Sequence, residues 1–555
     1  MQINFRKYIF RPFLIFSGIL FALILVLFCY VYFKSQISPP DVPPLAIGAR
    51  KIINEHHFVL GNNYLKKNEF GIWEMYLEGE PYERGLIYGE LAKELIRYQE
   101  EVFVDQIKQL VPSPTWQKTL TWIIGFFNSD LPNYIPLENQ QEIYGISKTF
   151  SDDFDFIGPK YVRILNYHAA HDIGHALNDY SMVGCSSFSL KGKRTKDSLM
   201  IIGRNFDFYV SDAFARDKMI VFVNPSKGYK FASYSWAGFT GVASGLNEKG
   251  LSVTINASKS DIPTASRMPI SLLAREILQY ASNLSEAIAI AGKRHTFVSE
   301  TLMIGSEKDG KTILIEKSPS KMDVYDAQSD EVICANHYQS ARFRNDDVNI
   351  QNIKESDSKY RFVRLQKLLN KNRLLDVKGA ADILRDQQDE NGDTLGMGNP
   401  RAINQLNGHH SVIIIPARKL FYVSTTDFQL GPYIGYDLMK SFNQKRLQIT
   451  DTISADPMLY SAAYSSYKIF RKQKKEIDSY LQFDEPLNFN SDNIQKFVAL
   501  NSESYITYET IGKYYQKKGN CDSATKYFTL ALTKKVASKK VEEEIKILIE
   551  KCSRK

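Results

Sequence analysis

The feature that most constrains this chain is an uncharged run near its N-terminus. The 21 residues from Phe13 to Phe33 carry no charged side chain, and a helix of that length can cross a bilayer core of roughly 30 Å. Arg6, Lys7 and Arg11 precede the run, whereas only Lys34 follows it closely. Since positive charge stays on the cytoplasmic side, the run predicts a single-pass anchor with its N-terminus inside and the rest of the chain outside.

A cleaved signal peptide is the alternative interpretation of this N-terminus. The apolar core of a signal peptide is usually about 7–15 residues long and ends in small residues, whereas this run ends in the bulky sequence Leu27-Phe28-Cys29-Tyr30. We therefore expect residues 1–34 to form a cytoplasmic tip and a transmembrane helix, with the folded part that follows on the periplasmic or extracellular face. Residues 35–49 contain four prolines and predict a stiff linker.

The composition is that of a folded globular chain. Hydrophobic residues make up 44% and charged residues 24% of the 555. The net charge of +8 is scattered without a basic stripe, so nucleic acid is not expected as a partner. The cysteines form neither a CxxC pair, a zinc pattern nor a disulfide framework, and we expect no metal and no cofactor. They are Cys29, Cys185, Cys334, Cys521 and Cys552.

The pattern of apolar and polar residues changes at Gly184. Residues 50–184 predict mainly helices, such as the run Glu90–Ile96, entered by a turn at Gly85 and Gly89. Residues 185–445 alternate short apolar runs with helical stretches, which is typical of a layered α+β sandwich. The expected strands are Ser198–Ile202, Met219–Val223, Leu251–Ile255, Thr312–Ile315, Val412–Ile415 and Leu420–Ser424, and the expected helices include Ile270–Tyr280 and Leu284–Ala291.

Residues 446–555 predict a helical C-terminal extension. Tyr508–Tyr515 followed by Ala524–Leu532 resembles one tetratricopeptide hairpin. A repeat array needs about three copies, and no second clear copy is present. A plain helical cap is the alternative.

A set of motifs beginning at Gly184 carries the chemistry. Taken singly each is ordinary, because a lone cysteine is usually a small core residue and an Asn/Gly-containing segment can be a plain hairpin turn. Their order and spacing are more informative than any one of them. The motifs are Gly184-Cys185-Ser186-Ser187-Phe188, Gly203–Phe208, Gly245–Leu251, Asn256, Asn336-His337 and Ser358–Arg361.

In this order the motifs resemble the cysteine N-terminal-nucleophile (Ntn) hydrolases. Choloylglycine hydrolases are one such group. The closer resemblance is to the autoproteolytic acyltransferases (the C45 family), which include acyl-CoA:6-aminopenicillanic acid acyltransferase, because Gly79–Gly89, His409–Ile413 and Gly431–Tyr436 also look like that family. The resemblance spans roughly residues 70–440. It implies a four-layer αββα Ntn-hydrolase sandwich, autocatalytic cleavage between Gly184 and Cys185, and two fragments that stay together.

The residues at the cleavage site fit that chemistry. A thiol becomes a good nucleophile only after it loses its proton. If Cys185 starts a chain, its own α-amine, which titrates near ~7.7–8.0, can act as the base. Gly184 has no side chain, so Cys185 can approach the preceding carbonyl with little hindrance.

The resemblance also implies roles for four further residues. Asp207 would orient the amine, and Arg204 would lie beside the thiol, where a fixed positive charge favours thiolate. Asn336 matches the family's oxyanion donor, and Asn256 matches the second asparagine of the choloylglycine group. Such donors matter because the loss of one typically costs about 10²–10³ in rate.

A late arginine completes the implied site. Arg361 matches it, since Arg361–Leu365 is expected to start a helix as in the family. Arg342, in Ser340-Ala341-Arg342-Phe343, competes for the same role.

Three histidines precede the nucleophile at helical spacing. His168, His171 and His175 would share one helix face, although Gly174 weakens that helix. A metal site and a substrate-contacting patch are open alternatives. The favoured interpretation is that these histidines are hydrogen-bonded within the interface between the two fragments.

Three functions remain open from the sequence. The first is hydrolysis of a small N-acyl amide or lipid-like substrate. The aromatic residues near Tyr209, Trp236 and Phe239 suggest an apolar acyl group, and a plain core role is the equal alternative for them. The second is acyl transfer to an amine. The third is an inactive scaffold that binds a protein partner through its C-terminal helices.

Overall fold

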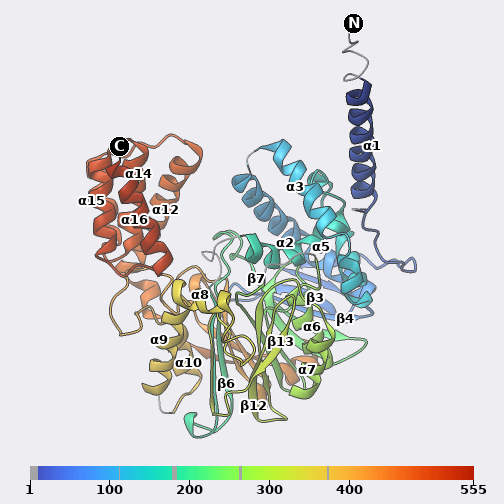
Figure 1. Cartoon of the computed structure of the whole chain (residues 1–555). Helices are drawn as coiled ribbons and strands as arrows, with labels where there is room; N and C mark the ends of the chain where they lie inside the picture. The colour runs from blue at the N-terminus through green and yellow to red at the C-terminus, as the bar shows by residue number, and fades with distance from the viewer. Residues whose placement is uncertain are drawn as a thin grey trace, which may run out of the picture.

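The computed structural model describes residues 11–34, 36–111, 113–177, 184–261, 266–371 and 374–554. Two β-sheets lie at its centre (Figure 1). The larger has 11 described strands, in the spatial order β1 (Lys51–Asn54), β2 (His57–Leu60), β3 (Asn63–Lys67), β4 (Trp73–Gly79), β7 (Lys218–Pro225), β8 (Phe231–Trp236), β9 (Ser244–Asn247), β10 (Leu251–Ala257), β11 (Glu300–Ser306), β12 (Lys311–Lys317) and β13 (Met322–Tyr325).

The smaller sheet carries the strand that directly follows Cys185. Neighbouring strands in it are antiparallel, including β5 with β6 and β6 with β15. Its seven described strands run in the order β14 (Glu331–Cys334), β5 (Ser186–Leu190), β6 (Ile201–Phe206), β15 (His410–Ile415), β16 (Leu420–Ser424), β17 (Tyr433–Asp437) and β18 (Ile449–Ile453).

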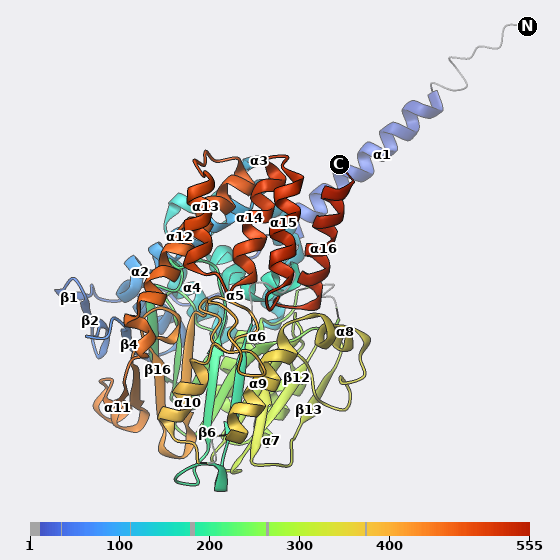
Figure 2. The same cartoon turned by 90° about the vertical axis from the view of Figure 1, so that its left-hand side faces the viewer.

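The helices lie outside the sheets and at one end of them (Figures 1 and 2). Those described are α1 (Arg11–Lys34), α2 (Pro81–Leu110), α3 (Pro114–Phe127), α4 (Leu137–Ser147), α5 (Lys160–Leu177), α6 (Ile270–Tyr280), α7 (Leu284–Lys293), α8 (Asp347–Glu355), α9 (Ser358–Lys371), α10 (Val377–Leu384), α11 (Leu438–Gln444), α12 (Ala462–Phe483), α13 (Ser491–Leu500), α14 (Tyr505–Lys517), α15 (Cys521–Leu532) and α16 (Lys539–Ser553).

The alternation of side chains along β15 shows how the layers pack. Val412 and Ile414 point into the core between the two sheets, where they meet Phe222 of the larger sheet. Ile413, between them, points the other way, into the core under α9 and α10. On the far side, α6 and α7 cover the larger sheet around Leu302. The predicted α+β architecture is confirmed, and its layers run helix, sheet, sheet, helix.

The expectation of a mainly helical segment over residues 50–184 is wrong for its first part. Residues 51–79 form β1 to β4, which pair with one another in antiparallel order. β4 also pairs in parallel with β7 from beyond Cys185, with Trp73 opposite Met219, a contact about 145 residues apart that local propensity does not report.

The predicted turn at Gly85 and Gly89 is also wrong. Both residues lie inside α2, which begins at Pro81. A Cβ at Gly85 would lie 2.1 Å from the carbonyl oxygen of Glu142 in α4. The glycines therefore allow close packing of α2 on α4, at the cost in helix propensity that glycine brings.

The C-terminal extension is helical, as predicted, but it begins later than residue 446. β18 adds Ile449–Ile453 to the edge of the smaller sheet before the helices start. Helices α12 to α16 then stand at one end of the sheets (Figure 2). α14 and α15 form the expected hairpin, with the Phe528 ring packed on Gly512.

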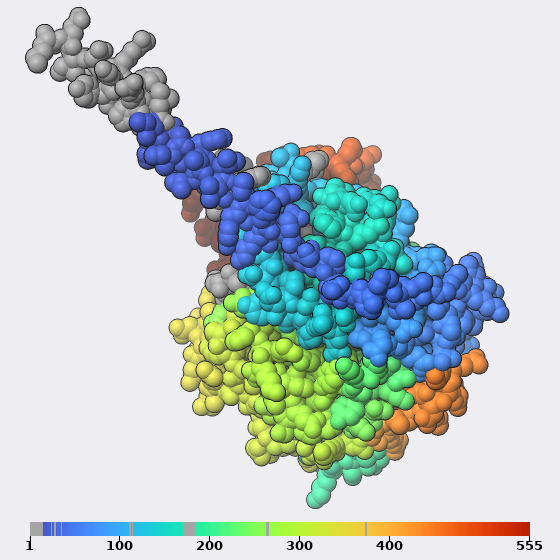
Figure 3. Space-filling view, turned by 90° about the vertical axis from the view of Figure 1, so that its right-hand side faces the viewer, coloured from blue at the N-terminus to red at the C-terminus, as the bar shows by residue number. Residues whose placement is uncertain are grey.

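The uncharged N-terminal run lies within α1, which extends from the body of the molecule (Figure 3). Across the described residues, no helix reaches the length and apolarity that a membrane crossing requires.

Candidate active site

Cys185 is buried at the head of β5, with 1% of its surface exposed. β5 lies between β14 and β6, so the thiol is held by a strand with neighbours on both sides. The chain is continuous from Gly184 to Cys185 in this structure. The geometry below is therefore that of the uncut chain.

Arg204 lies beside the thiol. β6 extends to Phe206, further than predicted, so Arg204 is within the strand and pairs across from Ser187. Its Nη2 atom donates to Cys185 Sγ at 3.7 Å, and its Nη1 atom donates to Ser244 Oγ at 2.8 Å. Burial raises the pKa of the Cys185 thiol, and the Arg204 guanidinium opposes that rise.

Asp207 follows β6 directly and is fully buried. Neither of its carboxyl oxygens has a hydrogen bond of ordinary geometry with a described residue. Burial raises its pKa to about 8, against the opposing influence of Arg361, Arg204 and the nearby Gln429 amide. A buried carboxyl without a partner is costly unless a cation joins it.

Arg361, in α9, reaches the same place from the other side. Its Nη1 atom donates to the Cys185 carbonyl oxygen at 2.6 Å, and its Nη2 atom donates to Asn336 Oδ1 at 2.7 Å. Asp357 accepts a further bond from Nη2 at 2.8 Å. Arg342 is instead exposed and donates to the Met322 carbonyl oxygen. The structure thus brings Arg361, and not Arg342, to the cysteine.

The two predicted oxyanion donors are buried near the head of β5. Asn336 donates from Nδ2 to the Ala257 carbonyl oxygen at 2.9 Å. Asn256 accepts from Ser187 Oγ at 2.8 Å, and its Nδ2 atom lies 3.3 Å from the Ala335 carbonyl oxygen. In the uncut chain both amides thus bind the backbone that surrounds the nucleophile.

Sequence reasoning missed Gln405. Its side-chain Nε2 atom donates to the carbonyl oxygen of Gly184 at 3.0 Å. The only available signal was its place four residues before the motif that starts at His409. Reasoning also missed His410, whose Nε2 atom lies 3.0 Å from Ser244 Oγ and 3.5 Å from Arg204 Nη1.

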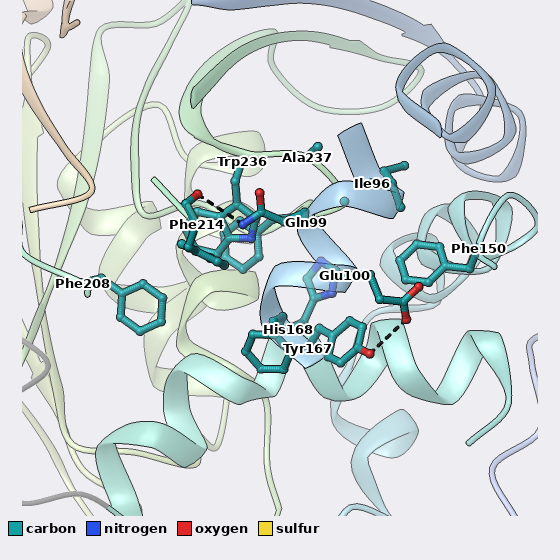
Figure 4. Close-up of a pocket in the computed structure, with 13 residues that line it drawn as sticks. Ile96, Gln99, Glu100, Phe150, Tyr167, His168, Phe208, Phe214, Trp236 and Ala237 are labelled. Atoms are coloured by element: carbon teal, nitrogen blue, oxygen red, sulfur yellow. Dashed lines mark hydrogen bonds between the residues drawn. The ribbon is translucent and has the colours of Figure 1, made fainter. Parts of the chain in front are cut away.

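A small aromatic cleft, with a cavity volume of about 50 Å³, lies close to these groups, and Figure 4 shows the side chains that line it. Phe206 connects the two regions, because its ring lies 4.1 Å from the Arg204 guanidinium and 5.6 Å from the ring of Phe208 in the cleft. We call this the aromatic cleft. Its lining residues are Ile96, Gln99, Glu100, Phe103, Phe150, Tyr167, His168, Phe208, Phe214, Trp236, Ala237, Gly238 and Phe239.

The predicted acyl-group residues fall partly in this cleft. Trp236 and Phe239 line it, with their rings 4.3 Å apart. Tyr209 is not among its lining residues; its hydroxyl accepts a hydrogen bond from Arg471 of α12 at 3.1 Å. α2 and α5 form one wall, whereas the other wall comes from residues beyond Cys185.

His168 is a hydrogen-bonded histidine at the boundary between the two predicted fragments. Nδ1 donates to the Ile164 carbonyl oxygen at 2.8 Å, and Nε2 accepts from the Thr240 backbone N–H at 2.9 Å. Burial lowers its pKa to about 4. The side chains of His171 and His175 lie outside the described residues. Within the described part of the chain, no cluster of His, Cys, Asp and Glu could hold a metal ion.

The Gly79–Gly89 segment contributes to the same boundary. Arg84 in α2 and Arg275 in α6 both donate to the buried carboxylate of Glu142. The hydroxyl of Tyr88 accepts from the Gly238 backbone N–H at 2.9 Å. The Arg275–Glu142 and Gly238–Tyr88 bonds join segments on the two sides of Cys185 in sequence, so they would hold the fragments together after a cut.

The structure combines a layered sandwich with a buried cysteine at the head of an inner strand, beside an arginine and an aspartate. Residues 193–395 match the model of the acyl-coenzyme A:6-aminopenicillanic acid acyl-transferase family. The match includes all the predicted site residues except Gly184 and Cys185. Over these residues the chain is thus similar to that family.

Curated relatives match at low identity. An uncharacterized protein of Archaeoglobus fulgidus is 27% identical over 237 residues, covering 39% of this chain and 38% of that protein. The chain therefore spans well under half the length of that relative. The N-acylethanolamine-hydrolyzing acid amidase of Caenorhabditis elegans is 23% identical over 324 residues, covering 56% of this chain and 83% of the amidase.

Solved structures match more distantly. The ortholog of N-acylethanolamine-hydrolyzing acid amidase from C. elegans is 18% identical, with a TM-score of 0.31, and covers 42% of this chain and 93% of its own. A mutant of the conjugated bile acid hydrolase of Clostridium perfringens is 16% identical, with a TM-score of 0.34, and covers 49% of this chain and 98% of its own.

Proposed function

We propose that the chain is an Ntn amidase that cuts itself between Gly184 and Cys185 and then hydrolyses an N-acyl amide through an acyl-enzyme on Cys185. The observation that carries this proposal is the buried thiol 3.7 Å from Arg204 Nη2. Next to this pair, the Asp207 carboxyl has no hydrogen bond among the described residues. A newly formed ammonium group would complete this arrangement.

The steps follow from these groups. The freed α-amine of Cys185 takes the thiol proton, and the Asp207 carboxylate orients the resulting ammonium. Sγ attacks the amide carbon, and the oxyanion is bound by Asn336 and Asn256. The C–N bond breaks as the ammonium proton passes to the leaving nitrogen. Water then hydrolyses the thioester, which releases the acid and restores the thiol.

The aromatic cleft favours an apolar acyl group. Its walls are mainly aromatic rings, and burying an apolar chain against them is stabilised by about 25 cal/mol per Å². A nematode relative is named as an N-acylethanolamine-hydrolyzing amidase. N-acyl amides with a fatty acyl chain are therefore the substrate class that we propose.

Acyl transfer to an amine is the second candidate, because the family model that matches is named for an acyl-transferase. Both reactions share the acyl-enzyme and differ in what attacks it. A catalytically inactive scaffold is the third. It is disfavoured by the presence of Cys185 and of each matched partner residue.

The test is an activity screen of wild type, Cys185→Ala and Cys334→Ala on N-acylethanolamines, N-acyl amino acids, bile salts, ceramides and penicillins. Cys334 is a second buried thiol, with burial raising its pKa well above the usual range. We expect wild type and Cys334→Ala to release acid from at least one class, and Cys185→Ala to release none. An active Cys185→Ala protein would refute the proposal. An added amine that captures the acyl group faster than water does would favour transfer.

The proposal extends to a membrane anchor, with the catalytic part outside the cytoplasm. It rests on the uncharged run Phe13–Phe33 in the sequence. α3, which contacts α1, exposes Trp116, Ile123 and Phe126, and aromatic residues suit a membrane interface. Washing membranes with alkaline carbonate should leave the fragment that carries the anchor, residues 1–184, in the pellet. Release into the supernatant would refute the anchor.

A further inference from the structure

Three hydrogen bonds with described residues hold the backbone of Gly184 and Cys185, at and on both sides of the peptide bond between them. The Gly184 N–H donates to the Asp207 carbonyl oxygen at 3.0 Å. The Gly184 carbonyl oxygen accepts from Gln405 Nε2 at 3.0 Å, and the Cys185 carbonyl oxygen accepts from Arg361 Nη1 at 2.6 Å. Among the described residues, Gln405 is the donor to the carbonyl that self-cleavage must attack. It is a neutral amide to which neither the motifs nor the proposed turnover assigns a role.

Gln405 is built into this position. Its side chain is buried, with 4% exposed. A Cβ on residue 184 would lie 2.2 Å from Gln405 Nε2. Gly184 is therefore needed to admit the Gln405 amide to its carbonyl, in addition to the easier thiol approach that the sequence suggested.

The loop that carries Gln405 is fixed on both sides. The Asn404 N–H donates to the Asp386 carbonyl oxygen at 2.8 Å, and its side chain donates to the Phe428 carbonyl oxygen at 3.0 Å. Arg471 of α12 donates to the Leu406 carbonyl oxygen at 3.4 Å. A donor fixed before the reaction stabilises developing charge without reorganisation. The C-terminal helices thus support the loop.

We propose that Gln405 is the catalytic oxyanion donor for self-cleavage, a step distinct from substrate turnover. This inference rests on the proposed function. Cys185 Sγ forms a bond to the Gly184 carbonyl carbon, and the negative charge that develops on its oxygen is bound by the Gln405 amide. The C–N bond then breaks, the thiol proton ends on the Cys185 nitrogen, and a thioester remains. Water hydrolyses the thioester to a Gly184 carboxylate and a free thiol.

The same geometry limits Gln405 to this step. After the cut, Gly184 ends in a carboxylate, and the carbonyl that Gln405 bound no longer exists. Substrate turnover uses the predicted asparagine donors, Asn336 and Asn256. Loss of Gln405 therefore slows formation of the mature enzyme and leaves its turnover unchanged.

The experiment follows pulse-labelled full chain on a gel as it splits into residues 1–184 and 185–555. We expect Gln405→Leu and the near-isosteric Gln405→Glu to split about 10²-fold more slowly than wild type, because each lacks the amide donor. Gln140→Leu is the matched control. Gln140 also donates its amide to backbone carbonyls, those of Pro132 and Ile135, both at 2.8 Å, and its loss should leave splitting at the wild-type rate.

A second measurement separates catalysis from folding. The split fraction of each Gln405 variant, titrated by its N-terminal cysteine, should hydrolyse an N-acyl amide at the wild-type rate per site. Splitting at the wild-type rate, or an equal loss in splitting and turnover, would overturn the role of Gln405. A wild-type chain that never splits would instead overturn the proposed function itself.

Discussion

The two halves of the candidate site are stabilised by different kinds of interaction. Around Cys185, four polar side chains are held in place by hydrogen bonds and charge, with distances such as 2.7 Å between Arg361 Nη2 and Asn336 Oδ1. We call this the polar half; its residues are Cys185, Arg204, Asp207, Asn336 and Arg361. The aromatic cleft beside it is shaped by ring contacts, such as the 4.3 Å between Trp236 and Phe239.

The difference between the halves separates two functions. Hydrogen bonds and charges are directional and lose most of their effect when displaced slightly, so the polar half suits a defined reaction. Apolar contact is non-directional and scales with area, so the aromatic cleft suits binding of a chain of variable length. Changes in the polar half should therefore alter rate, and changes in the cleft should alter affinity.

The largest effect is expected for Arg204→Gln, in the polar half. The Arg204 charge opposes the burial that raises the pKa of the Cys185 thiol, so its loss should raise that pKa further. We expect self-cleavage about 10²-fold slower at pH 7.5, the scale typical of losing one electrostatic stabiliser. The pH dependence of splitting should move to higher pH, which a merely misfolded chain would not show. An unshifted profile would contradict the assigned role.

A smaller and different effect is expected for Trp236→Leu, in the aromatic cleft. Removing this ring takes away apolar contact worth about 1.5–3 kcal/mol, so KM for a long-chain N-acyl amide should rise by roughly 10- to 100-fold. The kcat value and the KM of a two-carbon acyl substrate should change little. Phe442→Leu is the control, because Phe442 packs between the sheets, away from the cleft. A large fall in kcat would contradict the claim that the aromatic cleft contributes to affinity and the polar half to rate.

The smallest effect is expected for His168→Gln, at the boundary between the two fragments. His168 stays neutral when folded because burial lowers its pKa to about 4, whereas an unfolded histidine titrates near ~6.5. Between these values the unfolded chain binds more protons, so stability falls as pH falls. In a Cys185→Ala background, His168→Gln should lower the free energy of unfolding by about 1 kcal/mol at pH 7.5 and by less at pH 5.

Thermal denaturation at the two pH values measures that difference directly. Burial also lowers the pKa of other histidines, such as His337. Only the difference in the free energy of unfolding between the variant and its parent is therefore informative. If the difference in the free energy of unfolding is the same at both pH values, His168 does not contribute through its neutral state.

Sequence reasoning predicted the central strands and helices better than the strands β1 to β4 at one edge of the larger sheet. β16 and α6 fall at their expected bounds, because alternating and helical apolar patterns are local. β1 to β4 were missed: they pair with one another in antiparallel order, and only β4 pairs with β7 far along the chain. The two glycines inside α2 were wrongly predicted to form a turn. Their role in the structure is to allow close packing of α2 on α4.

The site shows the same limit. Cys185, Arg204 and Arg361 could be placed from motif order, since they lie on or beside regular elements. Gln405 could not, because it comes from a loop whose position depends on contacts with Asp386 and α12. The aromatic cleft could not be assembled from sequence either, as its walls come from segments on both sides of Cys185.

The most direct test of the whole account is intact mass and N-terminal sequencing of purified, active protein. We predict two associated fragments, the second of which begins with Cys185 and carries a free α-amine. Active protein in which residue 184 is still joined to Cys185 would contradict the account, because the thiol would then have no amine of its own to act as base.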